Sequence, residues 1–313
     1  LISGGGGVWE RSSKEIPLST EVRKWLGVRH STIEGDELVR RLLMAEVELL
    51  WNGGIGTYVR ASTEKNADVG DRANDNVRVT ATQVGAKVIG EGGNLGLTQR
   101  ARVEYSLAGG RINTDFIDNS AGVDCSDHEV NIKILLDKIV ADGDMTSKQR
   151  NQLLVDMTDD VAHLVLADNY AQTQAISVVV AGGAPRLYEQ ARFIHLLEQK
   201  GAFNRRLEGL PDKKGLTERV AIGQGLTKPE VAVLLAYSKM NYFDAIVNSD
   251  ITDDPFVADS LIGYFPAVLG ERFGDMIRAH RLRREIVATV VAGSISDNVG
   301  PGIGFRVREE VGT

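Results

Sequence analysis

The sequence repeats a pattern in which an apolar, strand-forming run ends in glycine or asparagine, and this repetition limits the fold that the chain can adopt. A stretch with leucine and valine at helical spacing, residues 36–46, separates the first two of these runs. The runs cover residues 1–7, 47–56, 86–94 and 111–122. Strand, helix, strand alternation is typical of a parallel sheet with covering helices. Ligands bind such sheets at the carboxyl ends of the strands, where these glycine and asparagine clusters fall.

The pattern changes to long helices in the second part of the chain. Thr146 and Thr227 each stand three residues before a glutamine or a glutamate, which is the spacing of a capping box at a helix start. Apolar residues at helical spacing follow each start. The sequence therefore predicts an α/β fold, in which a partial Rossmann-like parallel sheet in residues 1–136 precedes a mostly helical domain in residues 137–313.

The charge balance and the single cysteine exclude several classes of protein. The 43 acidic residues outnumber the 36 basic ones, which disfavours a nucleic-acid partner because affinity for phosphates rests on clustered Lys and Arg. Cys125 is the only cysteine, so a reducing cytoplasm fits best and a zinc site built on several thiolates is excluded. No apolar stretch reaches the roughly 18 to 20 residues of a membrane helix. The five histidines show no paired ligand spacing beside carboxylates or thiols, so no metal site is expected.

The first candidate site is the glycine-rich turn Asn52-Gly53-Gly54-Ile55-Gly56, which follows the second apolar run. Missing Cβ atoms let a backbone approach a ligand closely. Taken alone, however, such a cluster is more often a tight turn.

The second candidate site is Asn94, in a turn of small residues after the third run. Its side-chain amide can both donate and accept hydrogen bonds, which suits a ribose or a carboxamide. Asparagine also adopts the left-handed backbone conformation in turns. The residue types leave both interpretations open.

The third candidate stretch, residues 118–129, reads Asp-Asn-Ser-Ala-Gly-Val-Asp-Cys-Ser-Asp-His-Glu, and it joins a predicted strand over residues 112–117 to a predicted helix. With Glu91-Gly92-Gly93-Asn94 and Thr98, it resembles glutamate dehydrogenases. In that family Glu-Gly-Ala-Asn with a nearby threonine precedes Asn-Ala-Gly-Gly-Val and a serine three residues further on. The runs at 52–58 and 118–129 are similar to the large bacterial NAD-specific branch in particular, and the resemblance covers nearly the whole chain.

The resemblance implies a role for each matched residue. The residues that would line the NAD cofactor are Gly53, Gly54 and Asn94, and Asn119 would meet its nicotinamide end. Val123 and Ser126 would line the substrate pocket, where Ser126 would hydrogen-bond the side-chain carboxylate of glutamate. An alternative for Ser126 is a helix cap, since Ser126 and Glu129 have capping-box spacing.

Two departures from the family pattern affect the start of the predicted helix. Ser120 stands where the smaller enzymes usually have alanine, and Asp127 and His128 stand where aromatic residues are common. They put the geometry at the entrance of the helix in doubt, although not the cofactor face.

The resemblance implies NAD-dependent oxidative deamination of L-glutamate to 2-oxoglutarate and ammonia, by an enzyme expected to be a homo-oligomer. The family's catalytic lysines and aspartate lie on a separate amino-terminal domain that nothing here matches. The chain begins at Leu1, without methionine. We therefore expect a fragment with no catalytic residue of its own and no activity alone. A non-catalytic assembly or regulatory module is the main alternative, and a different amino-acid dehydrogenase is another.

Overall fold

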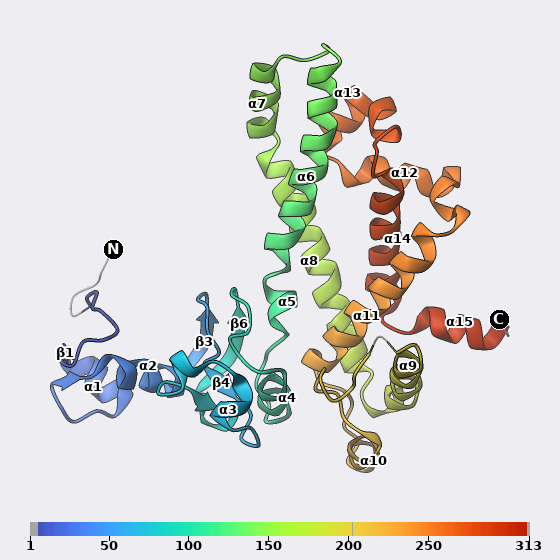
Figure 1. The fold of residues 1–313 in the computed structure, drawn as a ribbon. Coiled ribbons are helices and arrows are strands. Elements are labelled where there is room, and N and C mark those ends of the chain that lie inside the picture. The colour runs from blue at the N-terminus through green and yellow to red at the C-terminus, as the bar shows by residue number, and fades with distance from the viewer. Residues whose placement is uncertain (1–5, 202, 312–313) are drawn as a thin grey trace. The chain divides into compact units, whose positions relative to one another are not determined.

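A computed structural model describes residues 6–201 and 203–311, and the chain divides into two compact units (Figure 1). The first unit runs to Asn119 and includes Thr227–Pro229, and the second comprises the remainder. The predicted strand at residues 1–7 lies largely outside the described residues. The predicted boundary after residue 136 falls within helix α6 (Ser120–Ala141). As a division into separately folding domains, that boundary stays a prediction.

The first unit is organised around a parallel pair of strands. Strand β3 (Val47–Asn52) pairs with β6 (Ala86–Glu91), and helix α2 (Gly35–Met44) precedes β3, as the alternation predicted. Apolar side chains from both strands pack with those of a following helix, since Leu50, Ile89 and Ala101 share one core. The remaining elements are β1 (Ile16–Pro17), α1 (Thr20–Leu26), β2 (Thr32–Ile33), β4 (Val59–Arg60), α3 (Asn66–Val69), β5 (Val79–Thr80), α4 (Gln99–Leu107) and α5 (Asp115–Asp118), with 3₁₀ turns at Arg72–Asn74 and Ala81–Gln83.

The strand predicted at residues 112–117 is wrong. Only an isolated bridge joins Val88 to Arg111, and the chain then enters the short helix α5. The carboxylate of Asp115 accepts hydrogen bonds from the backbone N–H groups of Leu95 and Phe116, at 2.8 and 3.0 Å. The bond to Phe116 is a local side-chain hydrogen bond, and bonds of this kind compete with a strand ladder.

The second unit is helical. Its core joins the buried side of α6, through Ile132 and Leu136, to residues such as Leu269 and Ile277. Helix α8 (Thr158–Ala181) packs against both α6 and α14 (Arg283–Val299). The other helices are α7 (Ser147–Asp156), α9 (Leu187–Gln199), α10 (Lys213–Ala221), α11 (Lys228–Val247), α12 (Pro255–Tyr264), α13 (Ala267–Arg278) and α15 (Ile303–Val311), with 3₁₀ turns at Ala184–Arg186 and Asp250–Asp253. The mostly helical second part is confirmed.

One predicted helix start is confirmed in detail. The Thr146 hydroxyl accepts a hydrogen bond from the backbone N–H of Gln149 at 3.3 Å, and the Gln149 side chain accepts one from the Thr146 N–H at 2.9 Å. This reciprocal pairing satisfies backbone groups that the first turn of α7 leaves without helical partners.

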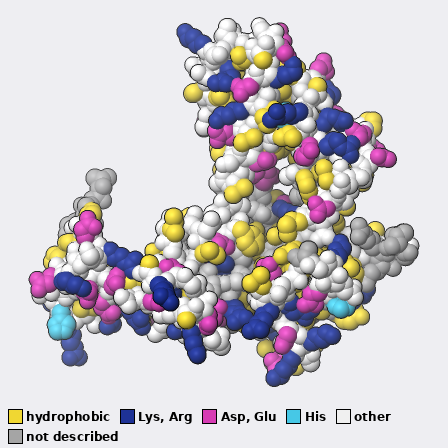
Figure 2. All heavy atoms as spheres, in the orientation of Figure 1, with side chains coloured by type: hydrophobic (Ala, Val, Ile, Leu, Met, Phe, Trp, Pro, Cys, Tyr) yellow, Lys and Arg dark blue, Asp and Glu magenta, His cyan; other side chains and the backbone are white. Residues whose placement is uncertain are grey.

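The surface carries both signs of charge. On the face drawn in Figure 2, acidic and basic side chains are intermixed over each unit. None of the helices in the described ranges is long and apolar enough to cross a bilayer. Cys125 is a free, exposed thiol.

Candidate functional site

Two glycine-containing turns meet at the carboxyl ends of the paired strands in the first unit. Strand β3 ends at Asn52 and β6 ends at Glu91. The backbone N–H of Gly93, in the turn after β6, donates to the carbonyl of Asn52 at 3.1 Å. A Cβ atom at Gly93 would lie 2.6 Å from the Gly54 carbonyl oxygen, so the two turns are in direct contact. The first two candidate stretches therefore form one surface.

Gly53 and Gly54 are not required by the turn itself. Neither has a positive φ, unlike Gly56 at 125°. A Cβ atom at Gly54 would meet nothing within 4 Å, and one at Gly53 would meet only the Trp51 ring, at 3.6 Å. The tight-turn explanation therefore applies to Gly56. Open space above Gly53 and Gly54 is what a closely approaching ligand needs.

Asn94 and Asn119, 25 residues apart in the sequence, are brought together. The side-chain amide of Asn119 donates a hydrogen bond to the side-chain oxygen of Asn94. Among the described residues, the only non-glycine residue with a positive φ is Leu95, at 59°. The left-handed alternative for Asn94 is therefore wrong, and its exposed amide keeps hydrogen-bonding capacity for a ligand.

A buried ionic network lies beneath this pair. The guanidinium of Arg102 donates to both carboxylate oxygens of Glu91, at 2.7 and 2.9 Å, and lies 3.1 Å from Asp115. The same carboxylates accept from the backbone N–H of Leu97, at 3.1 Å, and from that of Leu95, at 2.8 Å. Burial raises the pKa of Glu91, and the Arg102 guanidinium opposes this effect. The network fixes the loop that carries Asn94.

Asp118 ties the segment before Asn119 to the sheet. Its carboxylate accepts from the backbone N–H of Glu91 at 2.9 Å and from the Asn113 amide at 3.2 Å. Burial raises the pKa of this carboxyl. Both asparagines therefore rest on groups anchored at the end of β6. The sequence did not predict that Arg102, Asp115 and Asp118 support the two asparagines, because no local spacing connects these residues with Asn94 or the end of β6.

Thr98, which belongs to the matched pattern, caps helix α4. Its hydroxyl accepts from the backbone N–H of Ala101 at 3.1 Å and donates to Glu64 at 2.6 Å. The hydroxyl therefore has a structural use in this chain.

Val123 and Ser126 lie in the second unit, on helix α6. The helix begins at Ser120, so Ser126 stands in its interior and the capping alternative is wrong. Residues three apart share a face of a helix. Val123 is 72% exposed and Ser126 is also exposed, so this face of α6 is open to a ligand.

The residues that depart from the family pattern make contacts inside the second unit. They are Ser120, Asp127 and His128. The amide of Gln172, on α8, donates to the Ser120 hydroxyl at 2.7 Å. The hydroxyl of Tyr264, on α12, donates to Asp127 at 2.7 Å, and the His128 ring stacks on Tyr264 with centroids 4.4 Å apart. These residues tie α6 to its neighbours, and the helix runs from Ser120 through all three positions.

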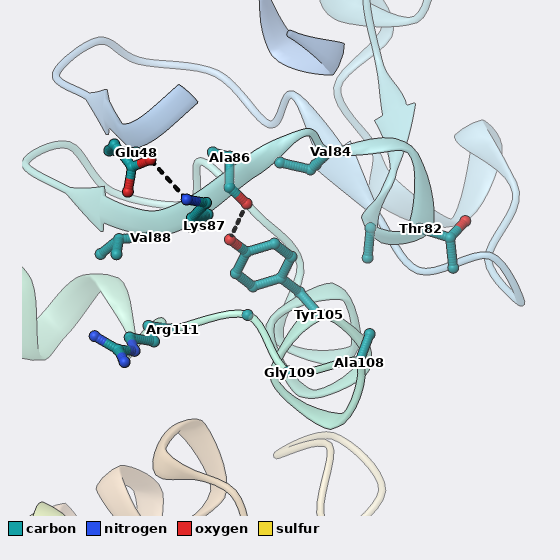
Figure 3. A pocket seen from close by; sticks show the side chains of 12 residues that line it. Glu48, Thr82, Val84, Ala86, Lys87, Val88, Tyr105, Ala108, Gly109 and Arg111 are labelled. Carbon is teal, nitrogen blue, oxygen red and sulfur yellow. Dashed lines mark hydrogen bonds and ion pairs between the residues drawn. The ribbon is translucent and has the colours of Figure 1, made fainter. Parts of the chain in front are cut away.

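A hollow in the first unit is lined by none of the candidate cofactor residues. It has a volume of about 530 Å³ and lies beside Ala86 and Lys87, at the amino end of β6. Figure 3 shows the Lys87–Glu48 ion pair and the hydrogen bond from Tyr105 to Ala86 at its edge. None of the residues that line this hollow was predicted to bind the cofactor.

The expectation that no histidine has paired ligand spacing is wrong. Asp124 and His128 lie one helical turn apart on α6, and Asp168 of α8 completes a group whose ligand atoms all lie within 4.8 Å of one another. Burial, together with the Asp168 and Asp127 carboxylates, raises the pKa of Asp124 to about 6. The i, i+4 spacing of an aspartate and a histidine was visible in the sequence.

Comparison with known proteins shows the family of this chain. Residues 1–179 match the family model described as bacterial NAD-glutamate dehydrogenase, catalytic domain, and residues 223–313 match glutamate dehydrogenase, C-terminal. This chain belongs to the bacterial NAD-glutamate dehydrogenase family.

The relatives are called NAD-specific glutamate dehydrogenases. All of this chain aligns with proteins from Pseudomonas aeruginosa at 50% identity, Halomonas elongata at 48% and Mycobacterium tuberculosis at 51%. The chain spans only 19, 19 and 20% of those proteins, or about one fifth of their length.

Proposed function

We propose that this chain supplies the cofactor-positioning and substrate-carboxylate residues of an enzyme that oxidises L-glutamate to 2-oxoglutarate and ammonia with NAD. The observation that carries the proposal is the contact between Asn94 and Asn119 beside the open glycine turn. Ligands of parallel sheets bind at this end of the strands. The family membership of the chain supports the same reaction.

In this proposal the open backbone at Gly53 and Gly54 lies against the dinucleotide, and Asn94 hydrogen-bonds it. Asn119 contacts the nicotinamide end of the cofactor. Its hydrogen bond to Asn94 fixes the orientation of the Asn119 side-chain amide. NAD, when bound, supplies the hydride acceptor. The contribution of these residues is positioning, which lowers the barrier by fixing the reacting groups before the transfer.

The substrate contacts are assigned to the exposed face of α6. The Ser126 hydroxyl donates a hydrogen bond to a carboxylate of glutamate, and Val123 packs against its methylene groups. Hydrogen bonds to charged groups are worth about 1.5 to 3 kcal/mol, so a single hydroxyl can contribute measurably to substrate selection. The proton-transferring lysines and aspartate are assigned to the part of the enzyme that this chain does not cover.

The experiment that tests this proposal compares the complete protein with the isolated chain. We expect the complete protein to reduce NAD steadily with L-glutamate and the isolated chain to produce no NADH, because positioning residues alone move no proton. Absorbance at the NADH band measures both. Steady turnover by the isolated chain, free of contaminating enzyme, would show that the active site has been misplaced. Preference of the complete protein for another amino acid would contradict the substrate assignment.

The main alternative is an assembly or regulatory module with no ligand of its own, in a homo-oligomeric enzyme. The helical second unit of this chain favours this possibility, because most of the unit's length carries none of the candidate residues. NADH fluorescence with the isolated chain distinguishes the two. Even weak binding supports the cofactor assignment, whereas a folded chain that binds no NADH supports the module.

A further inference from the structure

A polar cluster joins helices α6 and α8 inside the second unit. Asp124 and His128 project from one side of α6, one turn apart, and Asp168 faces them from α8. Nε2 of His128 lies 3.9 Å from a carboxylate oxygen of Asp124. Helix geometry of 100° per residue directs Ser126 to the opposite side of α6. The cluster therefore differs from the face assigned to glutamate.

The imidazole in this cluster is buried and lacks a well-formed hydrogen bond. His128 is 2% exposed and its ring lies against Tyr264, but within the described residues neither ring nitrogen has a partner in hydrogen-bonding geometry. One oxygen of Asp124 is also buried without a hydrogen bond. Burying polar atoms without partners costs about 1 to 3 kcal/mol each, so native structures almost always satisfy them.

The charges around the imidazole favour binding of a cation. Lys239 is the basic group that acts on Asp124, but its ammonium is paired with Asp297 at 2.9 Å. The carboxylate of Asp127 accepts a hydrogen bond from the Tyr264 hydroxyl. The carboxylates of Asp124 and Asp168 together carry two negative charges, which a divalent ion would balance.

We propose that Asp124, His128 and Asp168 bind a divalent transition-metal ion, with Zn²⁺ as the natural occupant. Two carboxylate oxygens and one imidazole nitrogen are ligands that Zn²⁺ accepts, and a water completes four-coordination. Mg²⁺ and Ca²⁺ prefer oxygen ligands alone, so the histidine selects against them. Metal bonds of about 2.0 to 2.2 Å require ligand atoms closer together than 4.8 Å. The exposed Asp168 side chain can make that movement.

This inference goes beyond the proposed function. The ion cross-links α6, the helix that carries Val123 and Ser126, to α8. It has a structural or regulatory role, because it holds the orientation of α6 within the second unit and takes no part in hydride transfer.

The test uses the complete protein, stripped of metal with a chelator and titrated with Co²⁺, whose visible absorption reports its ligands. We expect about one equivalent to bind, with a spectrum that Zn²⁺ abolishes. Asp168→Asn should weaken Co²⁺ binding at least about tenfold, since even outer-shell changes cost 10- to 100-fold. Because Asp168 is exposed, this variant should keep its fold, and His128→Gln tests the nitrogen ligand separately.

His163→Gln is the matched control, since it removes an exposed histidine from the same helix as Asp168. It should bind Co²⁺ as the parent does. Equal binding by the Asp168→Asn and parent proteins, or no Co²⁺ binding by a correctly folded parent, would overturn the proposal. So would tighter binding of Mg²⁺ than of Co²⁺. NADH affinity is measured in parallel, so failure of the metal site is distinguishable from failure of the cofactor site.

Discussion

Replacing Arg102 with methionine should destabilise the first unit by about 3 to 5 kcal/mol, the usual effect of removing one partner from a buried ion pair. Glu91 is 0% exposed and Arg102 is 3% exposed, so water cannot replace the lost guanidinium. The carboxylates of Glu91 and Asp115 would remain buried at close range. Hydrogen exchange of the α4 amides in the complete protein measures the effect, and we expect protection to fall about a hundredfold or more.

Arg100→Met is the matched control for this prediction, because Arg100 is an exposed arginine on the same helix. Surface substitutions usually change stability by less than about 0.5 kcal/mol. If the α4 amide hydrogens exchange at the same rate in Arg102→Met and Arg100→Met, the ionic network does not hold the first unit together. If amide protection is lost in Arg102→Met alone, this variant should also bind NADH more weakly, since the network fixes the loop that carries Asn94.

The parallel strand pair and the helix before it could be predicted from sequence because their signals are local. Apolar runs, their spacing and the small residues that follow them identify β3, α2 and β6 directly. The strand expected at residues 112–117 shows the limit of such patterns. Asp115 there bonds the backbone of Leu95, 20 residues away in sequence, and nothing in the run itself reveals that partner.

The candidate residues were found through motif order, but their environment was not. The segments that carry Asn94 and Asn119 are held by Arg102 of α4 and Asp118 of α5, which both bond to Glu91 at the end of β6. The start of α6 was also misplaced. Ser126 to Glu129 has capping-box spacing, yet the helix had already begun at Ser120, because capping spacing can occur within a helix as well as at its start.

Ser126→Ala in the complete enzyme should lower kcat/KM for glutamate at least about tenfold, or about 1.4 kcal/mol. The interior position of Ser126 makes alanine informative, because no cap is lost and alanine is the best helix former. Stability and NADH affinity should therefore stay at the parental level. Steady-state kinetics, with thermal unfolding of the same preparations, measures both expectations.

Cys125→Ala is the control for Ser126. It removes a side chain of similar size from an exposed neighbouring position on another side of α6. Its kcat/KM should stay within about twofold of the parent, as expected for a position without a transition-state contact. Parental kinetics in a folded Ser126→Ala enzyme would move the carboxylate contact to another residue.

Whether this chain positions NAD through its paired asparagines is measured by NADH fluorescence titration of the complete protein and its Asn94→Ala, Asn119→Ala and double variants. We expect each single variant to bind NADH about 1 to 3 kcal/mol more weakly, since a hydrogen-bonding partner is left unsatisfied. The two losses should not add in the double variant, because the side chains are bonded to each other. Parental NADH affinity in all three variants, with only thermal stability reduced, would show that both asparagines have a structural role and do not position NAD.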